Sequence, residues 1–75
     1  MNLYLLEQDH VGGYDTYDSV VVIAEDTEAA RVMIPDTNSV RYGAWTDDPS
    51  KVRVTYLGTS ADPVPGVVLA SFNAG

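Results

Sequence analysis

The sequence predicts a small α+β domain: an antiparallel sheet of about four strands in the order ββαββ, with one short helix packed on one face. Three observations predict it. Apolar residues recur at the spacing of strands, one short segment carries a helix-start signal, and turn-forming residues separate these segments. A chain of 75 residues has room for one domain, spanning residues 1–75.

The first two strands are predicted at residues 2–8 and 16–24. Leu3 and Leu5 alternate with other apolar residues, so both faces of the first strand are apolar, as is typical of a central strand. The second strand is built on the β-branched run 20–23. Two consecutive glycines at 12–13 supply the positive φ angles of a hairpin loop between them.

The helix has the clearest local signal in the chain. Asp26 is a favourable N-cap residue, and Glu28 follows in the first turn, where the helix dipole favours negative charge. The predicted helix continues through Met33, and Pro35 ends it. A helix of two to three turns is not stable alone, so its apolar residues must pack on the sheet.

Turn-forming residues dominate the segment 36–50, which is predicted to be irregular and to contain Trp45. A third strand is predicted at 51–57, with valines and a tyrosine on its buried face and polar residues between them. A loop at 58–66 contains two prolines, and the fourth strand follows at 67–72.

The predicted elements do not account for what covers the second face of the sheet. A single short helix cannot cover four strands on both sides, yet the first two strands are apolar on both faces. Either the segment that contains Trp45 folds over the second face, or a second copy or a bound target covers it.

Net charge is concentrated in the first half of the chain. Residues 1–36 hold eight acidic residues against Arg31, whereas residues 37–75 hold three acidic and three basic residues, and the total is −7. Such a charge repels nucleic acid and anionic membranes, and it attracts a basic protein surface. Equally, a net charge of this size keeps a small domain soluble, whatever its function.

No pattern in the sequence indicates catalysis, a metal or a cofactor. Asp9 and His10 are adjacent, but neighbouring residues usually point apart, so an exposed loop histidine is the expectation. The chain has no cysteine and one histidine, which excludes a structural zinc site of the usual ligands. The acidic pairs lack the spacing of a calcium-binding loop, and the two glycines lack the helix and lysine of a phosphate loop. We therefore expect no enzyme, no bound metal and no cofactor.

The aromatic residues offer a better binding signal. Tyr14 and Tyr17 alternate with Asp15 and Asp18 where the hairpin enters the second strand. Tyrosine is rigid and amphipathic and is enriched at binding hot spots, and carboxylates beside it suit an arginine-rich partner. The alternative is that one or both tyrosines pack at the sheet edge.

Three segments carry a resemblance to known proteins. The run Gly13-Tyr14-Asp15-Thr16-Tyr17-Asp18-Ser19 before a valine strand, the helical Glu28-Ala29-Ala30-Arg31 and the end 66–75 (GVVLASFNAG) resemble small proteins encoded by phages and mobile elements. Acidic proteins of this size in that group are similar to anti-CRISPR inhibitors. The resemblance implies an inhibitor that presents carboxylates where DNA phosphates would lie, and it gives no single residue a role.

We therefore expect a non-enzymatic inhibitor in the host cytoplasm, a monomer or weak dimer, which mimics DNA. Its partner would be a basic, nucleic-acid-binding host protein, such as a CRISPR effector subunit, with no direct contact to nucleic acid or membrane. The expected contact residues are Glu7, Asp9, Asp15, Asp18, Glu25 and Glu28, with Tyr14 and Tyr17 as anchors. The alternative is a structural or accessory module that self-assembles through the uncovered sheet face or an edge strand, with contacts from Leu3, Leu5, Val21 or Ile23.

Overall fold

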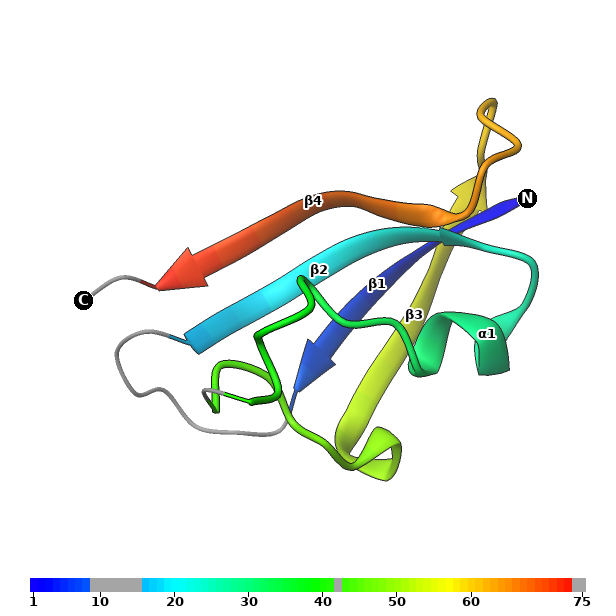
Figure 1. The fold of residues 1–75 in the computed structure, drawn as a ribbon. Coiled ribbons are helices and arrows are strands. Elements are labelled where there is room, and N and C mark those ends of the chain that lie inside the picture. The colour runs from blue at the N-terminus through cyan, green and yellow to red at the C-terminus, as the bar shows by residue number, and fades with distance from the viewer. Residues whose placement is uncertain (9–15, 42, 74–75) are drawn as a thin grey trace.

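The computed structural model describes residues 1–8, 16–41 and 43–73, which form one four-stranded antiparallel sheet with a short helix on one side (Figure 1). The strands lie in the order β3-β1-β2-β4, so the first hairpin forms the centre of the sheet. This confirms the predicted α+β class. The predicted ββαββ order is matched only in part, because a 3₁₀ turn at Pro49–Lys51 follows the helix and consecutive strands β3 and β4 lie at opposite edges.

The central strands β1 (Asn2–Gln8) and β2 (Thr16–Ala24) have the predicted bounds. They pair in antiparallel register, with Leu6 opposite Val20 and Tyr4 opposite Val22. Both strands are apolar on both faces, which agrees with their central position. The predicted glycine turn between them lies outside the described residues.

The edge strand β3 (Val52–Thr59) begins one residue later and ends two residues later than predicted, and β4 (Gly66–Asn73) is one residue longer at each end. β3 pairs with β1 and β4 pairs with β2, so the connection at residues 60–65 must pass the ends of both central strands. Backbone hydrogen bonding extends the strands to residues that the apolar pattern does not identify. Gly66, for example, pairs with Ile23.

Helix α1 (Thr27–Arg31) begins where the sequence predicts. The Asp26 carboxylate accepts a 2.8 Å hydrogen bond from the Ala29 amide. The helix ends at Arg31 and not at Met33, because the chain tightens at its last turn: the Met33 amide donates to the Ala30 carbonyl, three residues back. Ala30 is fully buried and fixes the helix on the sheet.

The core lies on one face of the sheet only. Leu6, Val20 and Val22 are its largest fully buried side chains, and Ala30 from the helix and Trp45 from the long loop join them. In Figure 1 the helix and the green segment that follows it lie on the same side of the sheet. Of the two alternatives given for the second face, covering by the Trp45 segment is therefore wrong, because the indole packs in the same core as the helix.

Candidate protein-binding surface

The register of the four strands defines the second face of the sheet. Leu3 lies opposite Ile23, and one step along the strands Leu5 lies opposite Val21, which in turn lies opposite Leu69 of β4. Residues directly opposite one another in an antiparallel sheet point to the same side. These five apolar side chains therefore share one face, which we call the open face: Leu3, Leu5, Val21, Ile23 and Leu69.

The next row of the same face is polar. Glu7 of β1 lies between Arg53 of β3 and Ser19 of β2, and Ser71 of β4 completes the row. The Glu7 carboxylate and the Arg53 guanidinium form an exposed ion pair at 3.4 Å. Such a pair contributes little to stability because both groups are solvated. The open face thus has an apolar half and a polar half.

Exposure increases across the open face toward β4. Ile23 is buried and Leu3, Leu5 and Val21 are half-buried, whereas Leu69 is 67% exposed. Helix α1 and Trp45 pack on the opposite face, and among the described residues only the loop 60–65 approaches the open side. An apolar sheet face that the described part of the chain leaves without a covering layer is typical of an interaction surface.

That loop forms a hollow at one end of the open face. The hollow has a volume of about 500 Å³, and Leu3, Ile23, Val64 and Val68 are among its apolar lining residues. The loop is held by its own hydrogen bonds: the Ser60 hydroxyl accepts from the Asp62 amide at 3.0 Å, and the Asp62 carboxylate accepts from the Val64 amide at 2.9 Å. The wall of the hollow is therefore preformed.

Two glycines flank the Leu3–Ile23 row. Gly58 lies opposite Leu3 with φ of 147°, and Gly66 lies opposite Ile23 with φ of 156°. A Cβ at either position would meet no atom within 4 Å, so the requirement for glycine is the positive φ and not the space. Because neither residue has a side chain, the row stays open at both edges of the sheet.

The described carboxylates predicted as contacts fall into two groups. Glu7 and Asp18 lie near the start of β2, where Asp18 is the extra residue of a bulge, whereas Glu25 and Glu28 follow the end of β2. The seven steps from Asp18 to Glu25 correspond to about 23 Å. Within the described part of the chain, the carboxylates of Asp18, Glu25 and Glu28 are exposed and form no ion pair. Asp9, Tyr14 and Asp15 lie outside the described residues.

Not all acidic residues share one face. Asp26 caps the helix, and the Asp36 carboxylate accepts hydrogen bonds from the Tyr17 hydroxyl and the Asn38 amide. The pKa of Asp36 is lowered, first by the Tyr17 hydrogen bond and then by that of Asn38. The pKa of Tyr17 is raised, mainly because its proton is held by Asp36. These carboxylates therefore have structural partners on the core side.

Tyr17, a predicted anchor, is half-buried against the core. Its ring also contacts Phe72 of β4 edge-to-face, with ring centroids 4.9 Å apart. Much of this side chain is therefore buried by contacts within the fold. This agrees with the alternative prediction, in which one or both tyrosines pack at the sheet edge. Phe72 remains 47% exposed, so it offers more free aromatic surface than the sequence indicated.

Gln8 is a key residue that the sequence did not reveal. Its Nε2 donates to the carbonyls of Tyr17 and Ala44 at 2.7 and 3.1 Å, and its Oε1 accepts from the Thr46 amide at 2.9 Å. The side chain thus fastens the Trp45 loop to the sheet. The signal that could have found it is a polar residue at a core-facing position, two residues after Leu6.

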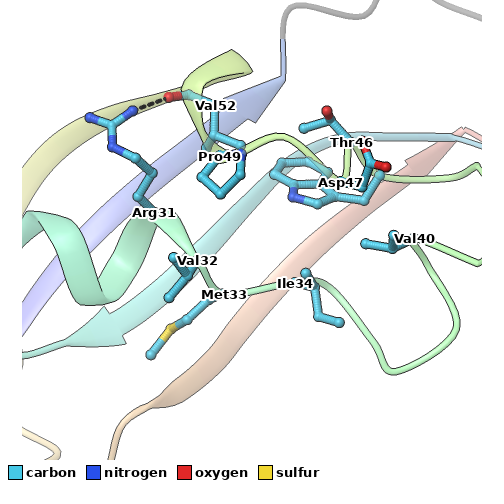
Figure 2. A pocket seen from close by; sticks show the side chains of 10 residues that line it. Arg31, Val32, Met33, Ile34, Val40, Thr46, Asp47, Pro49 and Val52 are labelled. Carbon is cyan, nitrogen blue, oxygen red and sulfur yellow. Dashed lines mark hydrogen bonds between the residues drawn. The ribbon is translucent and has the colours of Figure 1, made fainter.

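A second hollow lies on the helix side, near Trp45 (Figure 2). Its volume is about 130 Å³, below the roughly 300 Å³ at which small-molecule sites begin. Arg31 lines it, but its guanidinium is turned to the Val52 carbonyl, as Figure 2 shows. Val32, Met33 and Ile34 make the rest of one wall, so the hollow could accept a single apolar side chain and no cofactor.

Over the described ranges, no three acidic or histidine side chains come close enough together to hold a metal ion. Nor does any helix in that part of the chain have the length and apolar character needed to cross a bilayer. No protein-family model matches the chain, and no curated protein and no solved structure is significantly similar to it. The function of the chain is therefore inferred from its own surfaces.

Proposed function

We propose that this chain is a non-enzymatic interaction protein that docks its open face on a partner protein with a basic surface. The observation that carries the proposal is an apolar sheet face that no described element beyond the loop 60–65 covers, in a fold with exposed carboxylates near both ends of β2. An apolar centre with a polar rim is the usual organisation of a protein–protein interface. The exposed carboxylates then select the partner by charge.

Three exposed carboxylates support a basic partner. Asp18 lies at one end of β2 and Glu25 and Glu28 at the other, and each is free of ion pairs within the described residues. With a net charge of −7, the chain would be steered toward a cationic surface. Cationic protein surfaces commonly bind nucleic acid.

The specific form that we propose is a phage-type inhibitor that occupies the nucleic-acid-binding site of a host protein, as an anti-CRISPR does by DNA mimicry. Asp18 in β2 and Glu25 just after it, whose backbone positions lie about 23 Å apart along the strand direction, would replace phosphates at two separated positions and not along a continuous row. Between these positions the open face would supply the apolar contacts that DNA itself lacks.

The test is capture of nucleic-acid-binding proteins from nuclease-treated bacterial lysate on the immobilised chain, with elution by salt and by duplex DNA. We expect a captured protein that DNA displaces and that is released at high salt, since exposed charge pairs are screened. The double variant Asp18→Lys, Glu25→Lys should lose the capture. Asp47→Lys, which makes the same charge change as either single substitution and lies on the helix side, should retain it.

Binding that is insensitive to salt and to DNA would contradict the proposal. So would equal capture by the double variant and the Asp47→Lys control. In either case the carboxylates would be solvating groups only, and the open face alone would have to account for the partner.

A second candidate function is a structural or accessory protein that assembles with itself. The observation that favours it is β4, whose exposed side chains include Val68, Leu69 and Phe72 at the sheet edge. Such a protein would be a dimer or larger species in the absence of any partner.

A further inference from the structure

Strand β4 has the composition of a central strand but the position of an edge strand. Apolar side chains of β4 lie on both faces: Val67 and Ala70 lie opposite core residues of β2, and Leu69 lies on the open face. The other edge strand differs, since β3 places Arg53 and Thr55 on the open side. Among the described residues, β4 pairs only with β2, so its outer backbone groups have no strand partner.

Edge strands normally carry features that prevent pairing with another chain, such as charged residues or proline. The eight residues of β4 contain neither. Its pairing with β2 has two irregularities: Val68 is an extra residue in β4, and Asp18 is an extra residue in β2 opposite Ser71 and Phe72. In addition, Val67, Val68, Leu69 and Phe72 are between 42% and 67% exposed.

We infer that β4 pairs with β4 of a second copy, in antiparallel orientation about a two-fold axis perpendicular to the sheet. The inference names the partner and the geometry for the second candidate function and rests on it. Such an axis makes one strand self-complementary, since each residue contacts its counterpart in reverse order. Because β4 is uncharged, self-pairing brings no like charges directly opposite each other.

The pairing also extends the open face. A two-fold axis perpendicular to the sheet keeps the open faces of both copies on the same side. The row Leu5–Val21–Leu69 then continues into the same row of the partner, and β4 becomes a central strand of an eight-stranded sheet. A second copy thus accounts for the apolar composition of β4 on both faces.

The dimer is expected to be weak. A single pair of eight-residue strands is about 26 Å long and buries less than the roughly 1,600 Å² of a standard interface. Each copy also carries a net charge of −7, and this repulsion is screened by salt. Self-association should therefore strengthen as salt rises, whereas binding to a basic partner should weaken.

The first experiment is sedimentation equilibrium of the intact chain over a range of concentrations at low and high salt. We expect a monomer–dimer equilibrium that moves toward dimer at high salt. Leu69→Lys should remain monomeric, because it places two charges near the two-fold axis. Thr55→Lys, at an exposed position on the opposite edge strand, should behave as the unmodified chain, and circular dichroism should show that both variants are folded.

The second experiment uses the absence of cysteine from the chain. A spin label is placed at Ser71→Cys in β4 or at Thr55→Cys in β3, both exposed, and intermolecular distances are measured. Edge pairing predicts a short distance for the β4 label and roughly 34 Å between the β3 labels, which are seven strand spacings apart.

Each other outcome overturns the inference. Short distances from both labels would indicate that two open faces stack, which would retain self-assembly as a function but contradict β4 pairing. A monomer at every concentration and salt would contradict both. Dimerisation of Leu69→Lys equal to that of the unmodified chain would likewise exclude the β4 edge as the contact.

Discussion

The hydroxyl of Tyr17 donates a 2.8 Å hydrogen bond to the carboxylate of Asp36, 19 residues further along the chain. The bond joins strand β2 to the loop that carries Trp45. Other hydrogen bonds act beside it: the Tyr17 amide donates to the Ala44 carbonyl, and the side-chain amide of Gln8 donates to the carbonyls of both residues. A network of hydrogen bonds therefore connects the end of the sheet to the covering loop, beside the apolar core.

This network predicts sensitivity to acid. Because the pKa of Asp36 is lowered in the fold, its ionised form adds stability above the unfolded value of 3.8, and that stability is lost as pH falls through the lowered pKa. Tyr17→Phe removes the main cause, so its melting temperature should fall less between neutral and acidic pH than that of the unmodified chain. Thermal unfolding at several pH values measures this, and parallel curves would contradict it.

The stability of the fold should depend on the donor group of the Gln8 side chain. Gln8→Glu keeps the shape but places carboxylate oxygens against the carbonyls of Tyr17 and Ala44. We expect destabilisation of about 1–3 kcal/mol, as for a partly buried hydrogen bond left unsatisfied. Urea unfolding followed by Trp45 fluorescence measures it. Glu7→Gln, the neighbouring change on the opposite face, is the control and should stay within about 0.5 kcal/mol.

The two faces of the sheet should respond differently to truncation. Leu6 is fully buried, so Leu6→Ala should cost about 2–5 kcal/mol through lost contacts and a cavity. Leu69 is 67% exposed, so Leu69→Ala should change the free energy of unfolding by no more than about 0.5 kcal/mol in the monomer. Denaturant unfolding of both variants at low protein concentration makes the comparison. Similar losses would mean that a covering layer buries the open face.

The helix cap gives a fourth prediction. Asp26→Ala removes the carboxylate that accepts from the Ala29 amide and should destabilise the chain by about 0.5–2 kcal/mol. Glu25→Ala, one residue earlier, removes an equal charge without a capping bond. Urea unfolding should therefore show a smaller effect for Glu25→Ala, and equal effects would show that charge and not the cap is responsible.

Much of the local structure follows from the sequence. The bounds of β1 and β2 and the start of the helix are as predicted, because alternation, β-branching and an N-cap residue act within a few positions of the chain. Four residues of the open face, Leu3, Leu5, Val21 and Ile23, are also those predicted from the sequence as contacts for self-assembly. The structure places them together on one face.

Relationships between distant segments were not predictable in the same way. Nothing local places β3 and β4 at opposite edges, assigns Leu69 to the open face or turns Gln8 toward Ala44 and Thr46. The sequence allowed the Trp45 segment to cover either face of the sheet, and only packing beside Ala30 and Leu6 decided between them.

The sequence by itself thus determined which segments are strands and helix, and that the sheet would have more apolar surface than one helix can cover. The tertiary structure decided which face stays open and which strand lies unprotected at the edge. The physical reason is that secondary structure depends on neighbours within a turn or a strand. Strand order and coverage depend on where a long loop buries its apolar residues, which minimises exposed area for the whole chain.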